Sequence, residues 1–133
     1  MDLKSRRALL TCHANPDEKC EYIVSLAGIT NIGSHGTFNV RLTYVPHFLV
    51  LDAASLNDYL KALSCISGIT PEQSGRTILE DTNNELVPRW IRITLGESSE
   101  ANQGISHRCL FQDSQPNWSN SSLISAVNKI ETG

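Results

Sequence analysis

Asp52 is the residue whose position in the sequence points most directly to chemistry. It ends the apolar run that follows Val45-Pro46, and it comes just before a predicted helix that has Ser55 near its start. A carboxylate at such a position can point into a pocket. It can also cap the helix by accepting backbone hydrogen bonds, which is the commoner role of an acid there, and Ser55 could be the cap instead. The sequence leaves both roles of Asp52 open.

Histidine and cysteine side chains offer a second kind of chemistry, because both bind metal ions. His107 and Cys109 alternate on a predicted strand and share one of its faces, where a pair that lines the core is favoured over a pair of ligands. His13 lies close to Cys12 and Cys20, on a segment that we expect to be irregular and a poor metal site. The sequence thus predicts no metal site, and it assigns no role to its cysteines, Cys12, Cys20, Cys65 and Cys109.

The composition limits the classes of protein to consider. Hydrophobic residues make up 40% and charged residues 19% of the 133 residues, which is typical of a soluble globular chain and favours one domain over residues 1–133. Lys and Arg are scattered and the net charge is −3, which argues against a nucleic-acid partner. No apolar run approaches the roughly 20 residues that span a bilayer, and the one near the N-terminus is too short for a signal peptide. We therefore expect a cytoplasmic protein with reduced cysteines and no membrane partner.

Periodic apolar patterns predict the elements that position these side chains. Apolar residues alternate along residues 37–45, as on a half-buried strand, and recur at helical spacing from Leu56 to Leu63. Read in this way, the chain has strands over residues 20–27, 37–45, 89–95 and 104–112, and helices over about 52–66 and from Pro71 to just before Pro88. The remaining parts are an irregular N-terminal arm (1–18), a glycine-rich connection (28–36), a polar loop (97–103) and a C-terminal tail (113–133) with a short helix over 121–130.

This order of elements predicts an α+β fold. Four antiparallel strands with both helices on one face make a two-layer ββααββ unit. The exposed edges of so small a sheet need to be covered. Assembly of several copies into a ring, edge to edge, would cover them, so we expect a homo-oligomer.

The order of elements resembles the tunnelling fold, whose members assemble as rings and bind purine- or pterin-like heterocycles between subunits, anchored by an acid. Within that group the chain is most similar to the 7-cyano-7-deazaguanine nitrile reductases. Residues 43–60, TYVPHFLVLDAASLNDYL, are similar to the family's Tyr-Ile-Pro turn, apolar run, acid and Ser-Leu-x-x-Tyr-Leu. Residues 86–91, LVPRWI, are similar to its Pro-Arg-Tyr-Ile, and residues 70–73, TPEQ, stand where it has Phe-His-Glu-Asp.

The resemblance implies roles for four residues. Asp52 stands where the family has its heterocycle-anchoring glutamate, beside Ser55, and Glu72 stands where it has a second substrate-binding glutamate. Two carboxylates can accept paired hydrogen bonds from the N–H edge of a heterocycle. His35 lies in the loop that carries the nucleophile in the reductases, so it is a candidate general acid or base. The alternatives are a Glu72 that only offsets the helix dipole and an exposed His35 with no role.

The sequence departs from the reductases at the residues that do their chemistry. Their loop supplies a thiolate that attacks the nitrile and an aspartate that relays the proton. Ile29 stands here in place of that cysteine, Gly36 in place of the aspartate, and Pro71 in place of a histidine. Asn102 stands in place of an arginine associated with the reduced nicotinamide cofactor. Nitrile reduction by the family's mechanism is therefore not expected.

GTP cyclohydrolase I shares the same fold and holds zinc with cysteines and a histidine. Residues 106–109, SHRC, resemble its Thr-His-Met-Cys strand. The other ligands of that family would lie near residues 29–32, where the sequence has none. Because catalytic zinc needs three protein ligands, this resemblance does not predict a zinc site.

These observations favour an enzyme that uses a reductase-like scaffold for another reaction. We expect acid/base chemistry without a cofactor, of lyase, cyclase, isomerase or hydrolase type, on a small planar or polar substrate in an intersubunit pocket. Asp52, Glu72 and Ser55 would bind the substrate, and His35 and Glu72 would act in catalysis. The alternatives are a divergent NADPH-dependent nitrile reductase, with Cys65 or Cys109 as nucleophile, and a non-catalytic ligand-binding or assembly protein.

Overall fold

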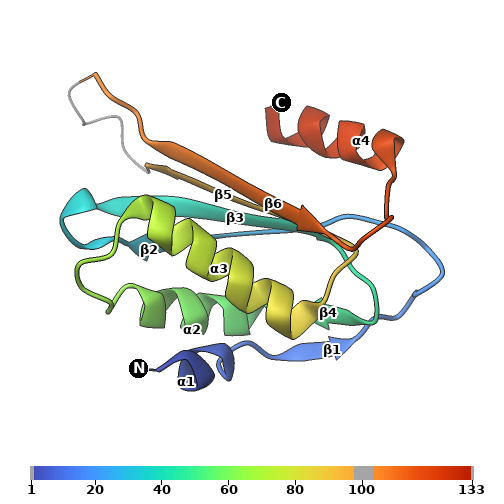
Figure 1. Cartoon of the computed structure of the whole chain (residues 1–133), viewed down its shortest axis with the longest axis horizontal. Coiled ribbons are helices and arrows are strands. Elements are labelled where there is room, and N and C mark those ends of the chain that lie inside the picture. Colours follow the sequence, from blue (N-terminus) through green and yellow to red (C-terminus); the bar gives the residue numbers. More distant parts are fainter. Residues whose placement is uncertain (1, 98–103, 133) are drawn as a thin grey trace.

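The computed structural model describes residues 2–97 and 104–132 (Figure 1). Strands β2 (Val24–Asn31), β3 (Thr37–Val45), β5 (Trp90–Glu97) and β6 (Arg108–Ser114) form an antiparallel sheet in the order β2-β3-β5-β6. Helices α2 (Ala53–Leu63) and α3 (Pro71–Leu86) lie on one face of it. The predicted ββααββ unit, with its two layers, is confirmed.

The core lies between this sheet and helices α2 and α3. Alternate residues of β3 are fully buried there, as the sequence pattern predicts: Phe38, Val40, Leu42 and Tyr44. Helix α2 contributes Tyr59 and Leu60, and α3 contributes Ile78. Helix α3 begins with a complete capping box, in which Thr70 and Gln73 exchange side-chain and backbone hydrogen bonds. This cap fixes where the residues of the first turn of α3 lie.

The N-terminal arm contains regular elements within the described residues 2–18, so the prediction of an irregular segment there is wrong. It contains helix α1 (Leu3–Arg7) and strand β1 (Cys12–Ala14), and β1 pairs with β4 (Leu49–Leu51) as a small second sheet. The backbone N–H of Asp52 donates to the carbonyl of Thr11 at 2.9 Å, next to that pairing. Long-range contacts of this kind have no local sequence pattern, which is why periodicity does not predict the arm.

Helix α4 (Ser121–Thr132) lies across the opposite face of the main sheet (Figure 1). The prediction of a helix in the C-terminal tail is confirmed. Val127 packs against Val45 and Trp90, and Arg92 from β5 pairs with Glu131 at 3.2 Å. The second face of the sheet is therefore partly covered within one chain.

Several predicted boundaries are wrong by a few residues. Strand β2 begins at Val24 instead of 20, and it continues through Asn31 into the segment predicted as a glycine-rich connection. Gly28 lets the extended strand pass close to α2, because any larger residue would place its Cβ only 2.8 Å from the Leu60 side chain. Strand β6 begins at Arg108 instead of 104, and α2 ends at Leu63 instead of 66.

Residues 98–103 of the predicted polar loop, with Asn102, are outside the described residues. Among residues 2–97 and 104–132, no helix is long and apolar enough to cross a membrane.

Candidate functional site

Asp52 is the N-cap of α2, the role that is commoner for an acid at that position. Its carboxylate accepts a hydrogen bond from the backbone N–H of Ser55 at 3.1 Å. The buried Ser55 hydroxyl donates to the carbonyl of Asp52 at 2.7 Å and accepts from the N–H of Thr11 at 3.1 Å. The Asp52 side chain is 42% exposed and lies 3.8 Å from His13 Nε2. Asp52 can therefore still contact a ligand, whereas the Ser55 hydroxyl is engaged within the chain.

Glu72 lies in the first turn of α3, and its side chain is 61% exposed. Its Oε2 lies 2.7 Å from Nε2 of His107, a hydrogen-bond distance. The pKa of Glu72 is lowered by a hydrogen bond from its own backbone N–H, and then by its hydrogen bond with His107. The carboxylate is thus held charged at the end of the helix while it remains open to solvent.

His107, which the sequence does not single out as a site residue, is the partner of Glu72. It immediately precedes β6, and its backbone N–H donates to Glu97 Oε1 at 2.7 Å. Its ring meets the Phe38 ring edge to face, with centroids 5.9 Å apart and planes at 78°. These contacts on two sides of the residue fix where the ring lies beside α3.

Cys109 lies two residues beyond His107 and on the same face of the chain. One ligand atom from each of Cys109, His107 and Glu72 lies within 4.8 Å of the others. Cys109 is partly buried against the core, and burial, followed by the charge of Glu72, raises the pKa of its thiol. The expectation that both residues line the core therefore fits Cys109, whereas His107 reaches out of the core to Glu72.

His35 is the third polar group at this end of the molecule. It is exposed on the turn Gly33–His35 between β2 and β3, which Gly33 and Gly36 allow by adopting φ of +47° and +95°. Its electrostatic interaction with Glu72 further lowers the pKa of that carboxyl group. The structure therefore brings His35 and Glu72 to the same end of the fold.

Asp52 and Glu72 lie at opposite ends of the helical layer. The N-terminus of α2, with Asp52, is beside β4, whereas the N-terminus of α3, with Glu72, is beside the β2–β3 turn (Figure 1). One chain does not bring the two carboxylates together on one ligand. A pocket that uses both of them has to combine two copies of the chain.

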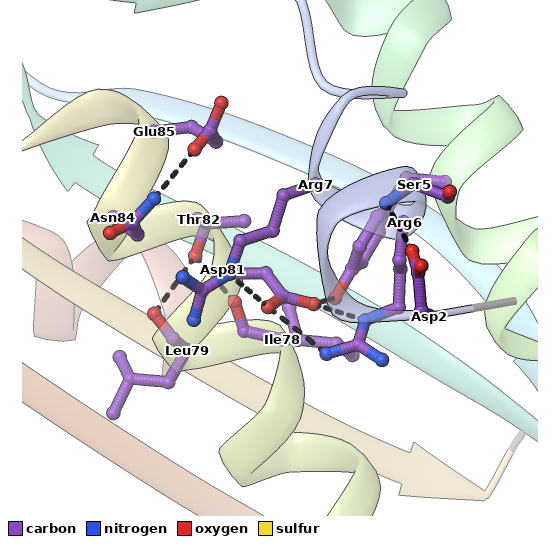
Figure 2. Close-up of polar contacts among 11 residues, drawn as sticks. Asp2, Ser5, Arg6, Arg7, Ile78, Leu79, Asp81, Thr82, Asn84 and Glu85 are labelled. Carbon is purple, nitrogen blue, oxygen red and sulfur yellow. Dashed lines mark hydrogen bonds and ion pairs between the residues drawn. The ribbon is translucent and has the colours of Figure 1, made fainter.

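A second group of charged residues, which no pattern in the sequence indicates, is centred on Asp81 of α3. Figure 2 shows its carboxylate between the side chains of Arg6 and Arg7 of α1. Arg6 Nε lies 2.5 Å and Arg7 Nε 2.7 Å from the carboxylate, which also accepts a hydrogen bond from the Tyr59 hydroxyl at 2.5 Å. The Asp81 side chain is fully buried. Burial acts to raise its pKa, but the hydrogen bonds from Arg6, Tyr59 and Arg7 outweigh this and lower it.

A shallow, open hollow of about 420 Å³ lies along α3 and the connection that precedes it. It is lined by residues 66–69, Gln73, Arg76, Thr77 and Glu80. Neither Glu72 nor His107 belongs to this lining. Glu72, His107 and His35 therefore lie on the surface of one chain, outside that hollow.

Comparison with known proteins adds evidence on the fold. No family model matches the sequence, and no curated protein matches it significantly. Among solved structures, the chain is similar to archaeosine synthase QueF-Like in its apo form, with a TM-score of 0.55 and 14% sequence identity over 70% of this chain and 92% of that one. This similarity supports the tunnelling fold that the sequence resembles. At 14% identity it concerns the fold alone.

Proposed function

We propose that this chain is an enzyme that uses acid/base chemistry on a small, planar or polar substrate. The observation that carries the proposal is the exposed carboxylate of Glu72, which lies 2.7 Å from His107 and interacts electrostatically with His35 at the same end of the fold. The similarity to archaeosine synthase QueF-Like supports the scaffold, and the chemistry is our inference from the side chains.

Glu72 has the properties of a substrate-binding carboxylate. It is charged and exposed, and a carboxylate accepts paired hydrogen bonds from a ligand's N–H groups. His35 would transfer a proton, since imidazole is the side chain that changes charge near neutral pH. Glu72 would assist that transfer by its charge.

The pocket would be completed by a second copy of the chain. Strands β2 and β6 are the edges of the main sheet, and pairing between copies would cover them. Asp52 lies at the far end of the helical layer from Glu72, so Asp52 of one copy would act with Glu72 of the next. Ser55 would contribute by holding Asp52 in place.

The thiols give less support to a divergent nitrile reductase. Such an enzyme needs a thiolate nucleophile, and burial raises the pKa of Cys109. Cys65 is exposed just beyond the C-terminus of α2, and its thiol donates a hydrogen bond to the carbonyl of Lys61. A divergent reductase is therefore our second candidate function. Its activity would depend on a reduced nicotinamide cofactor.

Binding is tested by measuring melting temperatures with purines, pterins, deazaguanines and reduced nicotinamide cofactors. A ligand of the native state raises the melting temperature by mass action. We expect a heterocycle to stabilise the wild type and Glu80→Gln, a matched change on the same helix, but not Glu72→Gln. A heterocycle that stabilises Glu72→Gln as well as the wild type would contradict the assigned site.

Catalysis is tested by following conversion of that heterocycle by His35→Asn. Loss of a general acid or base lowers turnover by about 100-fold or more, while the ligand-induced rise in melting temperature persists. His47→Asn, a change at a histidine whose side chain contacts Gln115 and Phe48 and none of the assigned site residues, should leave turnover intact. Unchanged turnover in His35→Asn would exclude the proton-transfer role. Tight binding with no turnover by the wild type would establish a ligand-binding protein instead.

A further inference from the structure

Glu72, His107 and Cys109 bring one oxygen, one nitrogen and one sulfur ligand atom within 4.8 Å of one another. We propose that these three side chains bind a divalent ion of the zinc class. The inference uses the site of the proposed function but does not depend on its acid/base chemistry.

The distances require only a small adjustment. Zinc binds nitrogen and oxygen ligands at about 2.0–2.2 Å and sulfur at about 2.3 Å, which places tetrahedral ligands roughly 3.3–3.7 Å apart. The Glu72 and His107 atoms, now 2.7 Å apart, would move slightly away from each other, and the Cys109 sulfur would move closer. Glu72 can make most of this change, because its side chain is long and exposed.

The surroundings hold the other two ligands in place. The chain at His107 is fixed by Glu97, and the imidazole ring by the ring of Phe38. Cys109 is paired with Leu95, next to the last pair of the β5–β6 ladder. These contacts hold both side chains near their present positions before an ion binds.

The donor set selects the type of ion. Thiolate and imidazole ligands favour zinc and cobalt over magnesium and calcium, which prefer oxygen. One carboxylate, one thiolate and a neutral imidazole balance the two charges of the ion. Coordination deprotonates a thiol outright, so the burial of Cys109 does not prevent binding. Three protein ligands would leave a position on the ion open for water or a ligand.

The sequence predicts no metal site because the three ligands come from distant parts of the chain. His107, just before β6, and Cys109 of β6 supply two ligands, and the third comes from the start of α3, 35 residues before His107. An ion bound here would also engage Glu72. Metal and heterocycle would then compete for this carboxylate.

The proposal is tested by adding Co²⁺ to the full-length, reduced and chelator-treated protein and recording its absorption spectrum. Binding to Cys109 should give a thiolate-to-cobalt charge-transfer band that saturates at one ion per chain and is removed by Zn²⁺ but not by Mg²⁺. The band should disappear in Cys109→Ser. In His107→Gln and Glu72→Gln the affinity should fall by at least about tenfold, the lower end of what even an outer contact to a ligand contributes.

The matched control is a triple variant, Cys12→Ser, Cys20→Ser and Cys65→Ser, which should keep the band. Circular dichroism of each variant tests whether it folds, and Cys109→Ala provides a second substitution at the sulfur position. A band that persists in Cys109→Ser, is lost in the triple control or is absent from the wild type would overturn the proposal. None of these results bears on heterocycle binding by the metal-free protein, so the two proposals can fail separately.

Discussion

Two carboxylates of the same helix, Asp81 and Glu72 of α3, have opposite surroundings. The Asp81 side chain is fully buried and receives hydrogen bonds from Arg6, Arg7 and Tyr59. The Glu72 side chain is 61% exposed, with His107 as its side-chain partner. Because the Asp81 side chain is buried and hydrogen-bonded to three other side chains, a ligand could reach it only by disrupting the fold. Glu72 can exchange its histidine partner for a ligand at little cost.

This difference separates a group that stabilises the structure from one that is suited to function. Asp81 ties α1 to α2 and α3, because its three partners come from α1 and α2. Burial, and then the hydrogen bond with Asp81, raises the pKa of the Tyr59 hydroxyl far above its usual value, so Tyr59 remains a donor. At the other end of α3, the Glu72 carboxylate is open to solvent and to a ligand.

Asp81→Asn is expected to have the largest effect on stability. The change leaves two guanidinium groups close together without their counter-charge, and only part of each reaches solvent. Removing one partner of a buried ion pair costs about 3–5 kcal/mol, and we expect the lower end because Arg6 and Arg7 are partly exposed. The free energy of unfolding in urea would measure this loss. Glu80→Gln on the exposed face of α3 should change it little.

A triple variant shows whether the loss of stability in Asp81→Asn comes from the unpaired arginines. Arg6→Met and Arg7→Met, combined with Asp81→Asn, remove the uncompensated charges and keep much of the side-chain volume. This combination should be more stable than Asp81→Asn alone. If this combination is less stable, the arginines contribute by packing against the core. The difference between Asp81 and Glu72 would then not be electrostatic.

The sequence predicts the main fold well because its signals are local. Alternation along residues 37–45 reflects a sheet with one face on the core, and the Thr-Pro-Glu-Gln start of α3 is a capping signal that acts within one turn. The helix-capping role of Asp52 is also local, and the structure confirms it. Such features depend on neighbours within about four residues, which a single sequence contains.

The candidate site is less predictable because its contacts are not local. Glu72 meets His107 across 35 residues, and Arg6 meets Asp81 across 75. The register of β6 decides whether His107 lies beside the start of α3, and a small error in the start of that strand hides the contact. The alternation of His107 and Cys109 places them on one face, but nothing local in the sequence indicates which element they face.

Gly75→Ala tests whether α3 must lie close to the sheet for Glu72 to reach His107. A Cβ at Gly75 would lie 2.5 Å from the Phe111 ring and 3.1 Å from Leu95, so α3 or the ring has to move. Overpacking of this kind costs about 1–3 kcal/mol, although alanine favours a helix more than glycine. Unfolding in urea measures the cost, and a shift of the His107 imidazole resonances in NMR spectra would report a changed contact with Glu72. Stability equal to that of the wild type, with unchanged resonances, would contradict the close packing.

The smallest expected effect is the change at acid pH in the stability that the charge of Asp81 contributes. The pKa of Asp81 is lower in the folded than in the unfolded state, so the unfolded chain takes up a proton first as the pH falls. The stability that Asp81 contributes is therefore present above its unfolded pKa of about 3.9 and is lost as the pH falls toward the folded value.

The free energy of unfolding of the wild type and of Asp81→Asn, measured from pH 7 to pH 3, gives a direct test. The difference between them should be constant down to about pH 5 and should narrow below about pH 4, because only the wild type loses this charge. The free energy of unfolding of Glu80→Gln should change with pH in the same way as that of the wild type. A difference that is independent of pH would mean that the Asp81 side chain acts through its hydrogen-bond geometry and not through its charge. The surroundings of Asp81 would then differ from those of Glu72 in packing and not in electrostatics.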